Sequence, residues 1–188
     1  ASTGYDAIDD AGKPAMILTG ARVLLTGASG GIGCALVAAL RHRGARLVIS
    51  SRDPSGSAEA ADTEFVRADL TDEEQVRHLA SAAGDIDVLI NNAGVGWYGN
   101  AAHMPCTDVR RLVEINMLAP LLLTRLLLPG MTTRRRGHIV FVGSVAGHLG
   151  VENEAVYSAT KAALRTYAEA LRAEVRRQGV GVSVVSPG

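Results

Sequence analysis

Arg22-Val-Leu-Leu25, followed at once by Thr26-Gly-Ala-Ser-Gly-Gly-Ile-Gly33, is the stretch that decides the fold of this 188-residue chain. The first four residues read as a short buried strand that runs into a cluster of glycines. Beyond the cluster, apolar residues recur at helical spacing until Gly44, a typical helix-ending residue. Strand, glycine turn and helix in this order form half of a βαβ unit, so the stretch predicts an α/β fold.

The rest of the chain continues the same alternation. Further short, mostly apolar runs read as strands at 46–49, 64–67, 87–90, 138–142 and 180–185. Helical periodicity covers 73–82, 107–128 and 155–178, and Thr71 with Glu74 is expected to form a capping box. Apolar strands that alternate with helices predict a doubly wound, mostly parallel sheet with helices on both faces. We expect one such domain over residues 21–188, preceded by a loosely ordered tail at 1–20.

The composition fits a soluble globular domain, with 47% hydrophobic and 20% charged residues. Lys+Arg and Asp+Glu both number 19, so the zero net charge gives no general reason to expect binding to nucleic acid or an anionic membrane. The basic triplet Arg134-Arg135-Arg136 is expected in a solvated loop, with an anion contact as the minor alternative.

Cysteine content and the apolar segments bear on the cell compartment. Cys34 and Cys106 are too few for a secreted disulfide framework and lack ligand-like spacing, so we expect no metal site and a cytoplasmic, reducing location. Residues 1–16 lack the basic and apolar regions of a secretory signal. The apolar run 117–131 contains Arg125 and two prolines and is shorter than the ~20 residues of a membrane span, so a buried helix is expected.

Two motifs carry chemistry. The glycine cluster places backbone N–H groups at a helix N-terminus, where a dinucleotide pyrophosphate would bind. In Tyr157-Ser-Ala-Thr-Lys161, the first and last residues share one helix face. A positive charge ~4 Å from the phenol, at an effective dielectric of ~20, is worth up to ~4 kcal/mol and could lower a tyrosine pKa by up to ~3 units. Either motif alone arises by chance, so their meaning depends on the combination.

Together with three further motifs, these residues resemble the short-chain dehydrogenase/reductase family, in the form with the glycine pattern T-G-x-x-x-G-x-G. The matching residues are Thr26, Gly27, Gly31 and Gly33 for that pattern, Asn91-Asn-Ala-Gly94 for N-N-A-G, Asn116, Ser144, Tyr157 and Lys161 for the catalytic tetrad, and Pro187-Gly188 for the final P-G. The likeness covers residues 22–188.

The resemblance implies a Rossmann fold and an oxidoreductase that transfers a hydride between NADP(H) and a carbonyl or secondary alcohol substrate. It implies that Tyr157 is the general acid/base, that Ser144 positions the substrate carbonyl, that Lys161 tunes the phenol and binds the nicotinamide ribose, and that Asn116 holds a water. The expected cofactor-binding residues are Thr26, Gly27, Ser29, Gly31, Ile32, Gly33, Ser51, Arg52, Asp69, Leu70, Asn92, Ala93, Gly94, Tyr157, Lys161, Pro187 and Gly188.

The choice of cofactor depends on the end of the second strand. An acidic residue at position 51 would bind the ribose hydroxyls of NAD and repel a 2′-phosphate. Ser51 and Arg52 instead suit a phosphate, so NADP(H) is expected over NAD(H). Asp53 could take part of the charge of Arg52, and Gly30 stands where many NADP-preferring relatives carry a basic residue.

Members of the family continue beyond the position of Gly188 into a substrate lid, a helix and a last strand, so we expect that these are missing from this sequence. Trp97, Tyr98, His148 and Leu149 are expected to line what remains of the substrate pocket. The resemblance also implies a homo-dimer or homo-tetramer. Two other functions stay open: a nucleotide-binding regulatory or scaffold protein, and an extended-type epimerase or dehydratase, which shares Y-x-x-x-K but has the spacing G-x-x-G-x-x-G.

Overall fold

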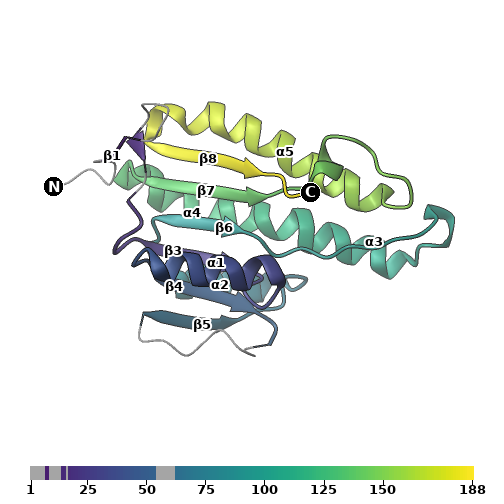
Figure 1. The fold of residues 1–188 in the computed structure, drawn as a ribbon, viewed down its shortest axis with the longest axis horizontal. Helices are drawn as coiled ribbons and strands as arrows, with labels where there is room; N and C mark the ends of the chain where they lie inside the picture. Colours follow the sequence, from purple (N-terminus) through teal and green to yellow (C-terminus); the bar gives the residue numbers. More distant parts are fainter. Residues whose placement is uncertain (1–6, 9–13, 16, 54–61) are drawn as a thin grey trace.

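The central sheet has six parallel strands in the order β5-β4-β3-β6-β7-β8. A computed structural model describes residues 7–8, 14–15, 17–53 and 62–188 of the chain. The strands of the sheet are β3 (Arg22–Thr26), β4 (Arg46–Ser51), β5 (Thr63–Arg67), β6 (Val88–Asn91), β7 (Gly137–Val142) and β8 (Val180–Val185). All six strands run parallel, and their carboxyl ends form one edge of the sheet (Figure 1).

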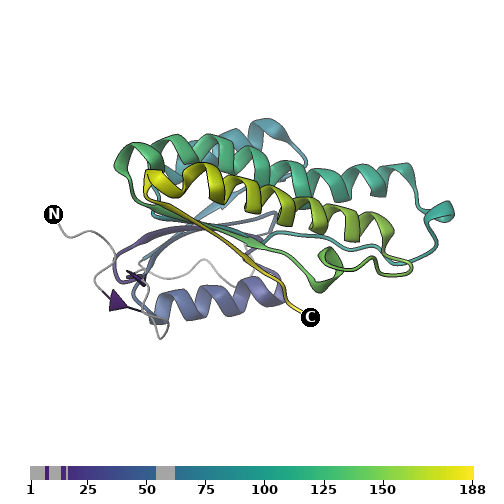
Figure 2. The same ribbon diagram turned by 90° about the horizontal axis from the view of Figure 1, so that it is seen from above.

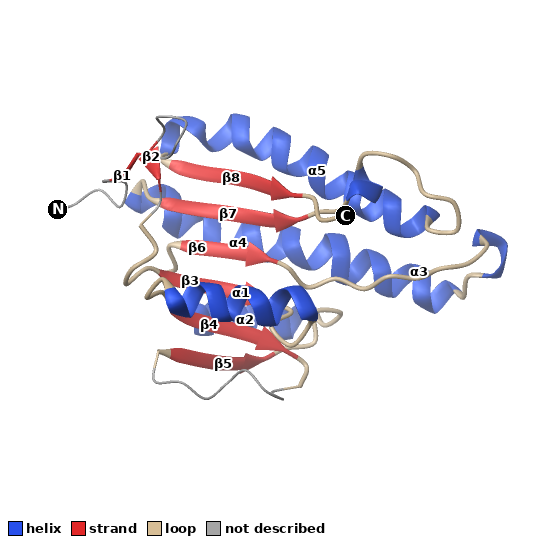
Figure 3. Cartoon of the chain, viewed as in Figure 1, coloured by secondary structure: helices blue, strands red, loops and turns tan. Residues whose placement is uncertain are grey.

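Helices cover both faces of this sheet. The longer ones are α1 (Gly31–His42), α2 (Glu73–Ala83), α3 (Cys106–Val113), α4 (Ala119–Arg134) and α5 (Ala155–Val175). Seen from above, α1 lies on one face of the sheet, and α2, α4 and α5 lie on the other (Figure 2). Short helical turns η1 (Ala101–His103) and η3 (Val145–Gly147) lie in loops, and η4 (Arg176–Gln178) continues directly from α5 (Figure 3). The doubly wound fold predicted from the sequence is confirmed.

The two faces explain why the strands are apolar nearly throughout. Leu24 and Val48 pack into the larger core under α2, α4 and α5, while Leu25 and Ile49 pack into the smaller core under α1. Leu24 pairs with Val48 and Leu25 with Ile49 across β3 and β4, so the register keeps each face apolar.

The start of α2 differs from the expected capping box. Asp72, not Thr71, is the N-cap, and its carboxylate accepts hydrogen bonds from the backbone N–H groups of Glu74 and Gln75. Thr71 donates both its backbone N–H and its hydroxyl to Asp69 instead. Aspartate is a better N-cap than threonine, so Asp72 accepts the first free N–H groups of the helix.

The helix predicted at 107–128 is longer than expected. It runs from Cys106 to Arg134 through a π-helical segment, η2 (Glu114–Leu118), and ends where Arg135 adopts a left-handed conformation with φ 51°. At 29 residues it is long and apolar enough to cross a membrane by length and composition, a test that buried helices of globular proteins also pass. Burial accounts for much of its apolar character, because Leu112, Ala119, Leu123, Leu127 and Met131 pack inside the molecule.

The basic triplet at the end of α4 forms ion pairs. Arg134 pairs with Asp85, and Arg136 contacts Asp87 at 2.6 Å. Asp87 also accepts the backbone N–H of Arg22, which ties the amino ends of β3 and β6 together. The predicted solvated loop is confirmed for Arg135 and Arg136, which are exposed in the turn between α4 and β7, whereas Arg134 belongs to α4.

The expected tail at 1–20 falls mostly outside the described residues. Within it, β1 (Ala7–Ile8) pairs antiparallel with β2 (Pro14–Ala15). Nearer the domain, Leu18 packs against the core under α1, and the Gly20 N–H donates to the Gly44 carbonyl at 2.7 Å. Residues 18–20 are thus attached to the end of α1.

Candidate active site

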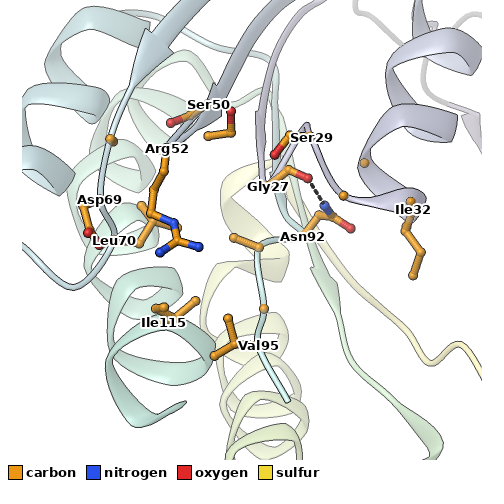
Figure 4. Close-up of a pocket in the computed structure, with 17 residues that line it drawn as sticks. Gly27, Ser29, Ile32, Ser50, Arg52, Asp69, Leu70, Asn92, Val95 and Ile115 are labelled. Atoms are coloured by element: carbon orange, nitrogen blue, oxygen red, sulfur yellow. Dashed lines mark hydrogen bonds between the residues drawn. The ribbon is translucent and has the colours of Figure 1, made fainter. Parts of the chain in front are cut away.

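A cleft of about 350 Å³ opens at the carboxyl ends of β3, β4, β5 and β6 (Figure 4). It contains twelve of the predicted cofactor residues: Gly27, Ser29, Gly31, Ile32, Gly33, Ser51, Arg52, Asp69, Leu70, Asn92, Ala93 and Gly94. In a doubly wound sheet this edge is where ligands bind, because the connecting loops separate there. The cleft is large enough for a small-molecule ligand.

The three motif glycines of this cleft are required for different reasons. Gly27 has φ +69°, and a Cβ there would lie 2.7 Å from Ala93 Cα. A Cβ on Gly33 would lie 2.1 Å from the Gly27 carbonyl oxygen, so that glycine lets α1 start directly against the turn. Gly31 has no protein atom within 4 Å of an added Cβ. Of the three motif glycines, Gly31 is therefore the one that the protein itself does not require, and the open space beside it can hold a ligand.

The turn after β6 is held against the glycine turn by side-chain hydrogen bonds. Thr26 Oγ1 accepts the N–H groups of Asn92 and Ala93, each at 3.1 Å. The Asn92 amide donates to the carbonyls of Thr26 and Gly27 (Figure 4). Thr26 itself is buried and does not line the cleft, so it positions the backbone of the neighbouring residues.

The far end of the cleft, where an adenosine would lie, carries both signs of charge. Arg52 extends into it from the end of β4 and makes no hydrogen bond or ion pair among the described residues (Figure 4). The hydroxyl of Ser51 donates to the Asp53 carbonyl, so its hydrogen is already engaged. The pKa of Asp69 is lowered by the Thr71 backbone N–H first, against the opposing effect of burial, and further by the charges of Arg52 and Arg111.

A second polar group gathers beside Gly94, where the carboxyl end of β7 meets α5. Lys161 is 4% exposed, and its Nζ donates to the Val142 carbonyl at 2.8 Å. The point where a Gly94 Cβ would stand lies 3.4 Å from Lys161 Nζ and 3.5 Å from Asn116 Oδ1. Burial lowers the pKa of Lys161 from 10.5 to about 8.

Asn116 reaches this place from the π-helical segment η2. Its amide exchanges two hydrogen bonds of 2.8 Å with the backbone of Val95 and donates to Thr160 Oγ1 at 3.2 Å. π-helical segments inside α-helices occur often at functional sites. Here the segment aligns a fully buried asparagine with the loop that follows N-N-A-G.

Tyr157 and Lys161 lie on the same side of α5, with Lys161 Nζ 5.7 Å from the centre of the Tyr157 ring. Ser144 follows β7, two residues after the Val142 carbonyl that receives the Lys161 ammonium. Ser144 Oγ accepts the Ala146 N–H at 3.2 Å, which leaves its own hydrogen for another acceptor. Pro187 accepts the Val145 N–H, so the end of the chain supports the same loop.

Some predicted residues lie away from the main cleft. Tyr157, Lys161, Pro187 and Gly188 do not line it. The four residues expected around a substrate pocket are divided: Trp97 borders a gap of about 10 Å³ beside Tyr157, whereas His148 and Leu149 border a separate hollow of about 620 Å³ along α5. Tyr98 is largely exposed, so the expectation of one shared pocket was wrong.

Five cleft residues were not predicted as cofactor-binding: Gly30, Ser50, Ala68, Val95 and Ile115. Each is a sequence neighbour of a predicted site residue, which is the signal that could have found them. Among the described residues, no group of three or more His, Cys, Asp or Glu side chains could hold a metal ion.

Comparisons with known proteins agree with these motifs. The family description "short chain dehydrogenase" matches residues 21–188. The ketoacyl reductase HetN of a Nostoc species is 41% identical over 185 residues, which are 91% of this chain and 64% of HetN. An uncharacterized oxidoreductase of Myxococcus xanthus is 37% identical, over 88% of this chain and 70% of that protein. The chain thus spans about two thirds of the length of these relatives.

Among solved structures, a metagenomic short-chain oxidoreductase in complex with NADP superimposes with a TM-score of 0.82 at 35% identity. The superposition covers 91% of this chain and 82% of that structure.

Proposed function

Because this chain belongs to the short-chain dehydrogenase/reductase family, we propose that it transfers a hydride between NADP(H) and a carbonyl or secondary alcohol substrate. The observation that carries the proposal is the buried Lys161 ammonium, held by the Val142 carbonyl beside the Tyr157 ring and the Asn116 amide. Burying a charge costs free energy, so a buried ammonium with a lowered pKa supports a functional role at this place.

The cleft fits a dinucleotide. Open space over Gly31 lies at the start of α1, where backbone N–H groups can receive a pyrophosphate. The residues that would hold the cofactor are the glycine turn, the Asn92-Ala93-Gly94 turn, and Arg52 with Asp69 at the adenosine end. When bound, the nicotinamide supplies or accepts the hydride.

Each residue beside Gly94 has a role that its environment supports. Tyr157 gives a proton to the substrate oxygen during reduction and takes one back during oxidation. The Lys161 charge favours the phenolate that results. The Ser144 hydroxyl, whose oxygen already accepts the Ala146 N–H, is free to donate to the substrate carbonyl.

We propose NADP(H) rather than NAD(H) because the second strand ends in Ser51 and Arg52 instead of a carboxylate. Arg52 has no hydrogen-bonding or ion-pairing partner among the described residues, so its guanidinium is available to a phosphate. Ser51 supports the preference for NADP(H) less than the sequence alone suggests, because its hydroxyl donates its hydrogen to the Asp53 carbonyl.

For the substrate, the 41% identity to a ketoacyl reductase favours a ketone carried on an acyl chain. A cytoplasmic location and a homo-oligomer are also proposed. The first is supported by the two free cysteines, and the second by the family and the partly exposed leucines of α4.

Nicotinamide fluorescence titration with NADPH and with NADH tests the cofactor proposal directly. We expect tighter binding of NADPH, followed by turnover with members of a ketone panel that includes a β-ketoacyl thioester. Cofactor binding without turnover of any ketone or alcohol would instead favour the regulatory or scaffold alternative.

The substitution Tyr157→Phe tests the acid/base role. We expect turnover to fall by at least ~10²-fold while NADPH affinity stays within about twofold, because only the proton donor is removed. Tyr167→Phe is the matched control: it removes a hydroxyl from the same helix, where the ring packs edge-on against Phe141. Equal activity of the two variants would contradict the role of Tyr157.

A further inference from the structure

The adenosine end of the cleft is short of positive charge for a doubly charged phosphate. Gly30 offers no side chain, and the hydroxyl of Ser51 is engaged with Asp53. Arg52 is the cation that lines the cleft, and the carboxylate of Asp69 lines it too. A phosphate monoester carries about −1.5 to −2 charges at neutral pH. A second cation near this place would therefore matter for a 2′-phosphate.

Arg111 is such a cation. It lies on α3 one helical turn before Ile115, so the two side chains share a helix face, and Ile115 lines the cleft. Its charge acts at Asp69, because Arg111 contributes with Arg52 to the lowered pKa of that carboxyl, after the Thr71 hydrogen bond. Arg52, which follows β4, and Arg111 on α3 thus both lower the pKa of Asp69, which lines the cleft.

Arg111 makes no polar contact that would stabilise the fold among the described residues. It is exposed and forms no hydrogen bond or ion pair with any of the described residues. Nor does it stabilise a free helix end, because α3 continues without a break into η2 and α4 and leaves no unpaired carbonyls there. An arginine without a partner beside a ligand cleft is available to an anionic ligand.

We propose that Arg111 is a second cationic residue for the adenosine 2′-phosphate of NADP(H), acting from α3 across the cleft from Arg52. The inference rests on the proposed function. Part of the selectivity for NADP(H) over NAD(H) would then come from α3, which lies outside the glycine turn and the second strand.

Binding measurements on the whole chain test this inference without relying on turnover. Arg111→Gln should weaken NADPH about 5- to 10-fold and leave NADH within about twofold, because NADH lacks the 2′-phosphate on which the charge would act. The same contrast should hold for 2′,5′-ADP against 5′-AMP, and it should shrink at high salt. Arg111→Lys should retain most of the selectivity, since it keeps the charge.

Arg110→Gln is the matched control. It removes the same charge from the neighbouring position of α3, which does not act at Asp69. If Arg111→Gln and Arg110→Gln behave alike, or if Arg111→Gln weakens NADH as much as NADPH, the inference is overturned while the proposed function stands. If the unmodified protein does not prefer NADPH to NADH, the proposed cofactor and the inference both fail.

Discussion

At the scale of single residues, the glycine motif combines requirements of the fold with those of a ligand. Gly27 and Gly33 are needed by the protein itself, since a Cβ on either would collide with backbone atoms. Gly31 meets no protein atom. A motif that looks uniform in sequence therefore separates into two glycines that close the turn and one that leaves room for a bound molecule.

This separation predicts different effects of two alanine substitutions. Gly33→Ala should lower the free energy of unfolding by roughly 1–3 kcal/mol or more, because the turn must shift to admit the methyl group. Gly31→Ala should leave stability unchanged or slightly raised, as expected for alanine at a helix start, yet weaken NADPH on the order of tenfold. Urea unfolding and cofactor titration of both variants measure the contrast, and a stable Gly33→Ala protein would count against it.

Lys161 is the other residue with a measurable consequence. Below about pH 8 the folded protein carries a buried charge, while the unfolded chain keeps its proton up to about pH 10.5. Between these values the unfolded chain binds more protons, so the free energy of unfolding should rise with pH. The difference between 10.5 and about 8 corresponds to about 3 kcal/mol, of which about 2 should appear between pH 7.5 and 9.5.

Urea unfolding at these two pH values, compared between the natural chain and Lys161→Met, isolates the contribution of this lysine. The chain has only two lysines, Lys13 and Lys161, so carbon-13 labelling of lysine also follows the titration directly. A Lys161 midpoint near its ordinary value of 10.5 would show that burial does not act as described.

At the scale of elements, the long helix through α3, η2 and α4 connects the two ends of the site. Its π-helical segment aligns Asn116 with the Val95 backbone and with Thr160 of α5. Thr160 also donates to the Tyr157 carbonyl at 2.7 Å. The hydroxyl of Thr160 thus joins the helix that carries Asn116 to the helix that carries Tyr157 and Lys161.

Two buried threonines test the value of that junction. Thr160→Val should lower the free energy of unfolding by about 1–3 kcal/mol, because it leaves the Asn116 amide without one of its partners. Thr124→Val in α4 should be neutral or stabilising, since Thr124 is fully buried and its hydroxyl has no hydrogen-bond partner among the described residues. Thermal and urea unfolding decide between them, and equal losses would mean that the Thr160 hydrogen bonds contribute little.

At the scale of the whole molecule, the parallel sheet brings residues distant in sequence to one edge. Strand order places the turn after β3 between those after β4 and β6, which assembles the cleft from segments around positions 30, 50, 70 and 93. At the opposite edge, the Asp87 carboxylate accepts the backbone N–H of Arg22 and forms an ion pair with Arg136. The cleft thus lies at the carboxyl ends of the strands, and the ion pair of Asp87 lies at their amino ends.

Self-association of the whole molecule is predicted by the family resemblance. Several leucines of α4, including Leu121, Leu122 and Leu126, are only partly buried against the larger core. Light scattering after size exclusion should give the mass of a homo-dimer or homo-tetramer, and a monomer at micromolar concentration would contradict the expectation.

The sequence by itself determined the alternation of strands and helices, the glycine turn, and the pairing of Tyr157 with Lys161, because each depends on spacing within a few residues. Tertiary structure decided the rest. Only folding shows that Ser51 turns its hydroxyl to Asp53, that Arg134 and Arg136 pair with Asp85 and Asp87, and that the charge of Arg111 helps to lower the pKa of Asp69. These are contacts between segments far apart in the chain or exact side-chain directions, and local periodicity carries no information about either.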